Sequence, residues 1–307
     1  VIACPCALVI STPVTVVSGL AAAARRGILI KGGAYLEEAR KITQMALDKT
    51  GTITEGKPRL VAQESLRADI AADQIWQLAA AMAARSDHPV SKAIVQGLAV
   101  STSLPEVEAF AAEAGRGTLG SIAGQALVLG NRRWIEERGQ LTPALAERLA
   151  VHERQGRSIS LLADAQGVLG LFAVADAIKP SSQQAIRELR ALGITPVMLT
   201  GDNPATAQAI AAEAGISEVQ AGLLPQQKLE AIQAMAAQPQ QAIGMVGDGI
   251  NDAPALAAAQ VGFAMGQAGT HTATEAADVV IMNDDLRRVP ETIRLSRRAH
   301  GVLWQNI

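Results

Sequence analysis

The chain has 307 residues, of which 49% are hydrophobic and 2% aromatic, and its formal net charge is −2. This length is enough for one or two domains, each with a core of its own. The near-neutral charge gives no support for nucleic-acid binding, and so few aromatic side chains exclude base-stacking platforms. The two cysteines, Cys4 and Cys6, stand one residue apart, which excludes a disulfide framework.

Residues 1–24 carry no charge and are followed by Arg25 and Arg26. Because about 20 apolar residues span a bilayer, this stretch with its basic boundary predicts a membrane helix. A buried core helix is the alternative. Pro5 and Pro13 favour a broken helix over a regular one, with backbone carbonyls freed near the two thiols.

The segment 48–54 reads Asp-Lys-Thr-Gly-Thr-Ile-Thr and directly follows the apolar run 45–47. The run predicts a strand that ends at the mouth of a sheet, where Lys49, Thr50 and a glycine turn can gather around a phosphoryl group. Asp48 at such a place can act as a nucleophile and form an acyl phosphate. Taken alone, the segment also fits a loop aspartate followed by a polar turn.

Residues 59–172 differ in style from the rest of the chain. A helical stretch over 69–85 leads to Ser-Asp-His-Pro at 86–89, and 168–174 reads as a buried strand. Between them lie a further helix and short strands, interrupted by glycines at positions 115, 117, 120 and 124. This segment therefore predicts an inserted domain of the α+β class.

From residue 175 onward, strands and helices alternate. The pattern predicts helices over 181–192, 204–214, 225–237 and 253–259, and strands over 196–199 and 242–246. Such alternation is typical of an α/β fold with a doubly wound parallel sheet. Reactive groups collect at the carboxyl ends of the strands in sheets of this kind.

Two of the expected strand ends and one helix start carry polar residues suited to phosphate chemistry. Thr200, Gly201 and Asp202 follow the strand over 196–199 and offer a hydroxyl and backbone N–H groups to phosphate oxygens. Lys228 opens a helix, where its ammonium can act as a point charge on a transferring group. Each of these features alone also fits a turn or a surface lysine.

A second carboxylate-rich segment follows the strand over 242–246. It reads Gly-Asp-Gly-Ile-Asn-Asp, with Asp248, Asn251 and Asp252. These carboxylates suit Mg²⁺, a hard ion that binds a few carboxylates and shares phosphate oxygens. A calcium-like loop or a plain turn is the alternative for the segment alone. Together with Asp48, the segments predict a phosphate pocket.

The order and the residues of these motifs resemble those of the haloacid-dehalogenase-like superfamily and, within it, of the P-type ATPases. Asp48-Lys49-Thr50-Gly51-Thr52 continues into Thr-x-Gly-x-Pro, the P-type pattern. Soluble phosphatases of the superfamily place a second aspartate two residues after the nucleophile, where this chain has Thr50. Without that carboxylate to activate water, we expect the aspartyl phosphate to persist, as a pump requires.

Two further motifs resemble the heavy-metal-transporting subgroup of these ATPases. The resemblance places Cys4 and Cys6 in a membrane helix as thiolate ligands, which select soft ions. It places His88 and Pro89 near adenine in the nucleotide domain, together with a Gly-x-Gly that we map to Gly115 and Gly117. The acidic residue that the family has five positions before the histidine is absent, since Ala83 stands there.

The motifs Ser-Thr-Pro at 11–13, Gly-Leu-Ala-Ala-Ala-Ala-Arg-Arg-Gly at 19–27 and Gly-Leu-Leu-Pro at 222–225 look more like the Zn²⁺/Cd²⁺/Pb²⁺ exporters than the Cu⁺/Ag⁺ pumps. The resemblance thus implies ATP-driven metal export from the cytoplasm across a membrane, with ATP and Mg²⁺ as cofactors. A copper or silver pump and, more remotely, a soluble phosphatase or a non-enzymatic metal-binding membrane fragment are the alternatives.

The resemblance also assigns roles to individual residues. Magnesium is expected at Asp48, Asp248 and the Thr50 carbonyl. The catalytic set is expected to comprise Asp48, Lys49, Thr50, Thr200, Gly201, Asp202, Lys228, Asn251 and Asp252.

The same resemblance implies a division of the chain and a place in the cell. We expect domains over 1–26 (partial transmembrane helix), 27–58 (connector and start of the phosphorylation domain), 59–172 (nucleotide-binding domain), 173–290 (remainder of the phosphorylation domain) and 291–307 (stalk and next membrane helix). An actuator domain, N-terminal to Val1, and further membrane helices are the expected partners, with the lipid bilayer. The expected location is the plasma (inner) membrane, with these domains cytoplasmic.

Overall fold

A computed structural model describes residues 6–100, 103–248, 252–266 and 271–305; side chains of 6–11, 271 and 273 lie outside this description. It divides into two compact units. The first comprises Val1–Glu55, Ile178–Thr200 and Ala211–Ile307, and the second comprises Gly56–Ala177 and Gly201–Ile210. The second unit thus interrupts the first, as an inserted domain does.

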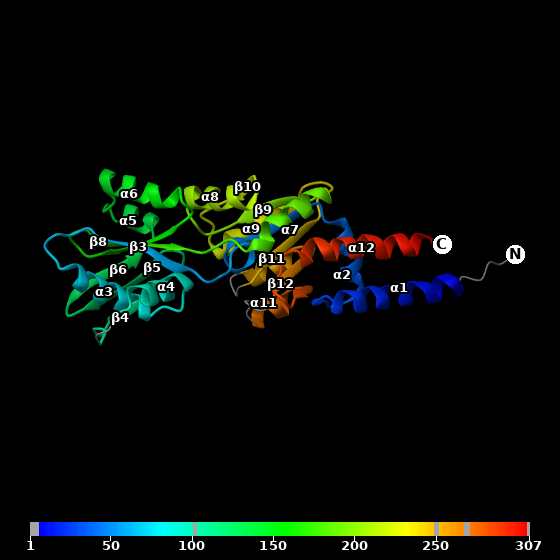
Figure 1. The fold of residues 1–307 in the computed structure, drawn as a ribbon, viewed down its shortest axis with the longest axis horizontal. Coiled ribbons are helices and arrows are strands. Elements are labelled where there is room, and N and C mark those ends of the chain that lie inside the picture. Colours follow the sequence, from blue (N-terminus) through cyan, green and yellow to red (C-terminus); the bar gives the residue numbers. More distant parts are fainter. Residues whose placement is uncertain (1–5, 101–102, 249–251, 267–270, 306–307) are drawn as a thin grey trace. The chain divides into compact units, whose positions relative to one another are not determined.

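The first unit is built on a largely parallel sheet (Figure 1). Within the described residues its strand order is β1-β13-β12-β11-β2-β9-β10, and only β1 pairs antiparallel, with β13. The strands are β1 (Ile28–Ile30), β2 (Gln44–Asp48), β9 (Thr195–Leu199), β10 (Glu218–Gln220), β11 (Ile243–Gly247), β12 (Val261–Met265) and β13 (Val279–Ile281). The central strands are buried on both faces because crossover helices cover them, which explains their continuous apolar runs.

The helices of the first unit are mostly short and amphipathic. They are α1 (Cys6–Ala24), α2 (Gly33–Glu38), α7 (Pro180–Ala191), α8 (Pro204–Ala214, shared with the second unit), α9 (Pro225–Ala236), α10 (Ala253–Ala258), α11 (His271–Ala276) and α12 (Arg288–Gln305). Short turns, η1 (Ala39–Lys41) and η2 (Lys49–Ile53), flank β2. Several helices begin with proline, whose missing N–H costs nothing in the first turn.

The second unit is an antiparallel sheet with helices. Its described strands run in the order β3-β8-β7-β6-β5-β4, and all neighbouring pairs are antiparallel. The elements are β3 (Arg59–Ser65), α3 (Ala72–Ala84), α4 (Pro89–Leu98), β4 (Glu108–Glu113), β5 (Gly117–Ile122), β6 (Gln125–Gly130), α5 (Arg132–Glu137), α6 (Pro143–Glu153), β7 (Ser158–Ala163) and β8 (Val168–Ala175). The α/β class with an inserted α+β unit is therefore confirmed.

The predicted elements of the parallel part agree with the structure within one or two residues, and α8 agrees at both ends. The strands β1, β10, β12 and β13 and the helices α2 and α11 have no counterpart among the sequence predictions. These are short elements of three to six residues, and their apolar runs are too brief to show a period.

Helix α1 continues through Pro13, so the break expected there is wrong. The helix packs against α12 and α2: a Cβ on Gly19 would meet Leu36 at 2.8 Å, and one on Gly33 would meet Val16 at 2.5 Å. This packing supports the helix across the hydrogen bond that the proline lacks.

None of the helices within the described residues has both the length and the apolar character that crossing a membrane requires.

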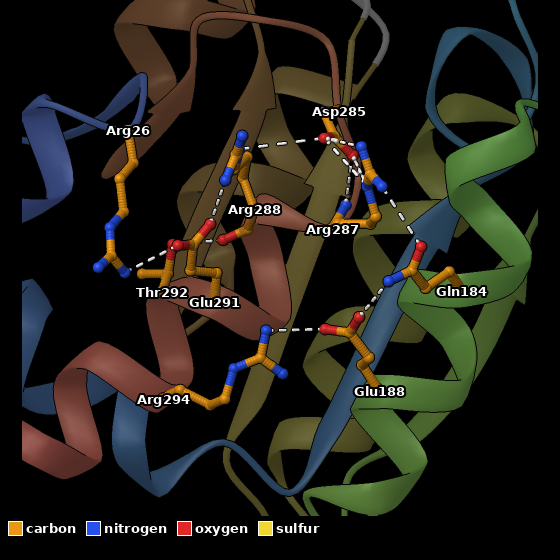
Figure 2. A network of polar contacts seen from close by, with 9 residues as sticks. All are labelled: Arg26, Gln184, Glu188, Asp285, Arg287, Arg288, Glu291, Thr292 and Arg294. Carbon is orange, nitrogen blue, oxygen red and sulfur yellow. Dashed lines mark hydrogen bonds and ion pairs between the residues drawn. The ribbon is translucent and has the colours of Figure 1, made fainter.

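Helix α12 runs alongside α1 and is tied to the rest of the first unit by charged side chains (Figure 1). Figure 2 shows how Glu291 accepts hydrogen bonds from Arg26 at 2.8 Å and from Arg288 at 2.5 Å. On α7, Glu188 accepts a hydrogen bond from Arg294 at 2.7 Å. Most of these groups are exposed or half-buried, so each pair contributes little alone, and their joint effect is to orient α12.

The core of the second unit depends on Phe172, which is fully buried and meets Trp76 edge to face with ring centroids 5.5 Å apart. We expect Phe172→Ala to lower the free energy of unfolding of this unit by about 3–5 kcal/mol, because it leaves a cavity. Urea unfolding followed by tryptophan fluorescence measures this. Val61→Ala, at a position 46% exposed on β3, is the matched control and should stay within about 0.5 kcal/mol of wild type. Similar losses in both variants would contradict the assignment of this core.

Candidate active site at the carboxyl end of the parallel sheet

The parallel register brings the expected motifs to one sheet edge. Strand β2 lies between β9 and β11, with Asp48 opposite Leu199 and Leu47 opposite Val246. Thr200 follows β9 directly, and Asp248 follows the last residue of β11. Three strand ends therefore present Asp48, Thr200 and Asp248 side by side, which is where parallel sheets place their reactive groups.

Three carboxylates meet at this edge. Ligand oxygens of Asp48, Asp248 and Asp252 all lie within 4.8 Å of one another. Lys228, in the first turn of α9, donates a short hydrogen bond to Asp48 and a second one, of 2.9 Å, to Asp252. All four side chains are buried or half-buried, so the charges interact strongly. The structure thus brings together residues that are 204 positions apart in sequence, from Asp48 to Asp252.

The electrostatics of this cluster are unbalanced. Burial raises the pKa of Asp248 to about 8, and repulsion from Asp48 and Asp252 adds to the shift. Burial likewise raises the pKa of Asp48 to about 6, with Asp252 adding to the effect and Lys228 opposing it. For Lys228, burial lowers the pKa, but its two carboxylate partners outweigh burial and leave the pKa well above its ordinary value. Lys49 also lowers the pKa of Asp48, and Lys179 lowers that of Asp248, but these lysines do not offset burial and the neighbouring carboxylates.

This donor set fits a magnesium ion. Its ligands are hard carboxylate oxygens that lie close together, and the raised pKa values of Asp48 and Asp248 are consistent with a site that lacks positive charge. A divalent cation would supply that charge and allow the carboxylates to ionise together.

The turn after Asp48 is shaped by Gly51. Its φ is +71°, in the left-handed region, and a Cβ there would lie 1.7 Å from Oδ2 of Asp248. Only glycine allows the loop and this carboxylate to approach so closely. In the same turn the hydroxyl of Thr52 is buried and has no hydrogen-bond partner in the described part of the chain. The loop is therefore packed against Asp248 and not open to solvent.

Lys179, which the sequence analysis did not single out, also lies at this site. It is 6% exposed, and its ammonium donates to the Gly51 carbonyl at 2.5 Å and to Asp284 at 2.8 Å. In sequence it is one lysine before a proline at a helix start, which reads as an ordinary surface residue. No pattern in the chain could have marked it, because its burial comes from segments 51 and 284 folding over it.

The remaining catalytic candidates divide between the units. Thr200 is buried in the first unit; its N–H donates to Gln220 and its carbonyl accepts from Leu223, both at 3.0 Å. Gly201 and Asp202 belong to the second unit, where Asp202 accepts a hydrogen bond of 3.1 Å from Ser158. Lys49 is buried in the η2 turn, and Thr50 beside it is half-buried.

The nucleotide candidates all lie in the second unit. His88 is exposed and caps α4, accepting from the Val90 N–H at 3.3 Å, and Pro89 is the first residue of that helix. Gly115 lies in the turn between β4 and β5, and its carbonyl accepts from the Asn131 side chain at 2.7 Å. Gly117 is required by sheet pairing, because a Cβ there would lie 2.2 Å from the Leu129 carbonyl.

Asn131 is a second residue that the sequence analysis did not single out. Its backbone N–H donates to the Arg116 carbonyl at 2.8 Å, and its side chain donates to the Gly115 carbonyl. Asn131 therefore holds the Gly-x-Gly turn at two consecutive carbonyls. Ala83, where the resembling family has an acid, is fully buried in the core of this unit. Cys4 and Asn251 lie outside the described residues; Cys6 begins α1, but its side chain is also outside them.

With this geometry in view, comparison with known proteins is decisive for the family. Residues 42–260 match the model for haloacid dehalogenase-like hydrolases. The chain belongs to the haloacid dehalogenase-like hydrolase family. The matched region contains Asp48, Lys228, Asp248 and Asp252, the four residues of the buried charge cluster.

The relatives of this family member are metal-transporting P-type ATPases. It is 44% identical over 309 residues to the zinc/cadmium/lead-transporting P-type ATPase of Escherichia coli (strain K12), covering 100% of this chain and 41% of the relative. It is 40% identical over 308 residues to the copper-exporting P-type ATPase of Bacillus subtilis (strain 168), covering 100% of this chain and 38% of the relative. The chain thus spans less than half the length of these curated relatives.

A solved structure is also similar to this chain. The crystal structure of a zinc-transporting PIB-type ATPase in its E2.Pi state matches with a TM-score of 0.69 and 42% identity, covering 98% of this chain and 49% of that chain. The similarity covers both units of this haloacid dehalogenase-like protein.

We expect Gly51→Ala to weaken Mg²⁺ binding sharply, because the added methyl group would overlap the Asp248 carboxylate. Gly193→Ala is the matched control: its φ is +77° in the same unit, but nothing lies within 4 Å of the added Cβ. Both variants should lose about 1–2 kcal/mol of stability from backbone strain. Only Gly51→Ala should lower the Mg²⁺ affinity measured by calorimetry, and equal Mg²⁺ affinities in the two variants would contradict the packing described here.

The pKa of Asp248, raised to about 8, predicts that Mg²⁺ competes with a proton. Mg²⁺ affinity should therefore rise between pH 6 and pH 8, by up to about tenfold per pH unit, and then level off. Calorimetry in buffers of different ionisation enthalpy should show proton release on binding. An Mg²⁺ affinity that does not change between pH 6 and pH 8 would contradict the assignment.

Because Asp48 and Asp248 bind protons more tightly in the folded than in the unfolded chain, the metal-free protein should lose stability as pH rises from about 4 to 8.

Proposed function

We propose that this chain is the catalytic part of a P-type ATPase that exports a soft heavy metal, Zn²⁺, Cd²⁺ or Pb²⁺, through an aspartyl-phosphate intermediate. The observation that carries the proposal is the buried contact between Asp48, at a strand end, and Lys228, inside a group of three carboxylates. The names of the relatives and of the matching zinc-transporting structure support it.

In the proposed reaction a carboxylate oxygen of Asp48 attacks the γ-phosphorus of ATP in line. A new O–P bond forms as the bond to the ADP oxygen breaks, and ADP leaves with the electron pair. Lys228 stabilises the developing negative charge together with Thr50, Thr200 and Gly201. Lys49 and Asp202 complete the proposed catalytic set. Lys228 is well placed for this because its ammonium already contacts the nucleophile.

We assign the magnesium ligands to Asp48, Asp248 and the Thr50 carbonyl, with Asn251 and Asp252 orienting them. Bound Mg²⁺ would neutralise phosphate charge. Asp252 suits the orienting role because its carboxylate accepts from Lys228 and does not cap α10, although it stands at the N-cap position.

ATP is proposed to bind the second unit through His88, Pro89, Gly115 and Gly117. His88 is exposed and is therefore available to a base, and the hydrogen bond from Asn131 holds Gly115. Gly117 contributes bare backbone, although its lack of a Cβ is already explained by the sheet.

The transported ion is assigned to Cys4 and Cys6, whose thiolates prefer soft ions. The zinc-group reading rests on the motifs at 11–13, 19–27 and 222–225, and on the relative and the structure that carry zinc in their names. A Cu⁺ or Ag⁺ pump is the second candidate, favoured by the similarity to a copper-exporting ATPase.

The proposal extends to the parent protein. Residues 1–26 are assigned to part of a membrane helix and residues 291–307 to a stalk and the start of the next one, in a plasma-membrane protein with the intervening domains in the cytoplasm. An actuator domain and further membrane helices would complete the pump. A soluble phosphatase remains the rival outside transport, and Thr50 speaks against it, because a phosphatase of this family needs an acid/base carboxylate there.

The test is phosphoenzyme formation from labelled ATP, in membranes that contain the longer parent protein, with Zn²⁺, Cd²⁺, Pb²⁺, Cu⁺ and Ag⁺ in turn. We expect acid-stable label with the divalent ions and none in Asp48→Asn, because the amide cannot form an acyl phosphate. Lys57→Met, a change in an exposed side chain outside the charge cluster, is the control for expression and folding.

Each outcome decides between the readings. Label with Cu⁺ or Ag⁺ only would keep the pump and reject the zinc-group assignment. Label that persists in Asp48→Asn would reject Asp48 as the nucleophile. Rapid phosphate release from small phosphomonoesters, without metal stimulation, would favour the phosphatase.

A further inference from the structure

Lys179 is a buried cation next to the phosphorylation turn that has no part in the roles assigned above. Its Nζ lies 2.5 Å from the Gly51 carbonyl and 2.8 Å from Oδ1 of Asp284. The Lys179 side chain is 7% exposed and the Asp284 side chain 23%, so the ammonium is shielded from water while its counter-ion is partly exposed. A buried ammonium with a backbone carbonyl on one side and a carboxylate on the other is strongly oriented.

The backbone around Lys179 holds the same turn. Its N–H donates to the Ile53 carbonyl at 3.0 Å, and the Ser182 hydroxyl donates to the same carbonyl at 2.7 Å. Thr54 forms a bridge with Ile178. The residues at the start of α7 therefore contact the turn after Asp48 at two places, in its middle at Gly51 and at its end at Ile53.

The contact at Gly51 is the one that bears on chemistry. A Cβ on Gly51 would overlap the Asp248 carboxylate, and the Gly51 carbonyl accepts a hydrogen bond from the Lys179 ammonium. The ammonium adds a restraint on this peptide, which matters because glycine permits a wide range of backbone angles. Rotation would change the distance between the turn and the Asp248 carboxylate.

The counter-ion is itself held in place. Asp284 has a φ of +53°, an unfavourable value for a residue with a Cβ, and the ion pair with Lys179 contributes to keeping it there. The next residue, Asp285, accepts hydrogen bonds from the side chain of Arg287, which also donates to Gln184 on α7 (Figure 2). The segment that presents Asp284 is thus fixed on both sides.

We propose that Lys179 is a positioning residue for phosphoryl transfer at Asp48: with Asp284 as its counter-ion, it sets the Lys49–Ile53 turn against Asp248. The inference rests on the proposed function for its chemistry, but the positioning of the turn can be tested without ATP or transport.

The test uses the whole chain with Mg²⁺ and beryllium fluoride, a phosphoryl mimic that binds an aspartate carboxylate. In Lys179→Met we expect beryllium fluoride to bind roughly tenfold to a hundredfold more weakly, from the loss of a charge-assisted contact. Mg²⁺ alone should also bind more weakly. Lys179→Arg should recover part of both affinities, because it keeps the charge and the donors.

Lys31→Met is the matched control. Lys31 likewise donates two hydrogen bonds in the same unit, but it is exposed and both bonds go to backbone carbonyls, those of Thr274 at 2.9 Å and Glu275 at 2.8 Å. It should lower thermal stability and leave both affinities unchanged. A lysine with only a structural role would behave as Lys31 does.

Wild-type affinities for Mg²⁺ and beryllium fluoride in Lys179→Met would overturn the proposal and leave the proposed function standing. Conversely, if the wild-type chain bound no beryllium fluoride but Lys179→Met still weakened Mg²⁺ binding, the phosphoryl site would fail and the positioning role would hold. Equal losses in Lys179→Met and Lys31→Met would also overturn the inference, because they would mark a general loss of stability.

Discussion

The buried contact between Asp48, Lys228 and Asp252 is the interaction on which the rest of the site depends. Two carboxylates taken out of water are costly, and one ammonium between them offsets only part of that cost. The third carboxylate, Asp248, makes the deficit of positive charge larger. A cluster with this deficit favours the binding of a divalent cation, which would supply the missing positive charge.

The parallel sheet is what makes this concentration of charge possible. Strands β2, β9 and β11 end together, so the residues that follow them must converge, while their own apolar side chains are buried by helices on both faces. The polar cluster therefore lies at the rim of a rigid core. Around it, Gly51 lets the turn approach Asp248, and Lys179 closes the far side of the same peptide. Precise placement comes from this packed surrounding and not from the cluster itself.

The two units carry different candidate residues on different kinds of sheet. The first holds the charge cluster on a parallel sheet, and the second presents an exposed histidine and a glycine turn on an antiparallel one. The segment 201–210 belongs to the second unit, although Thr200 before it belongs to the first. The Thr-Gly-Asp motif thus spans, in sequence, the boundary between the two units.

The fold class, most helices and strands of the parallel part, and the charged residues of the cluster could be predicted from the sequence. They depend on local periodicity and on motifs a few residues long. Asp48, Lys228, Asp248 and Asp252 could be chosen since each follows a strand or opens a helix. Tertiary structure alone decided the burial of Lys179, the clamp of Asn131 on Gly115, and the need for glycine at 51 and 117. It also carried α1 through Pro13. Each of these depends on atoms from segments far apart in the chain, and contacts of that kind leave no pattern in the neighbouring sequence.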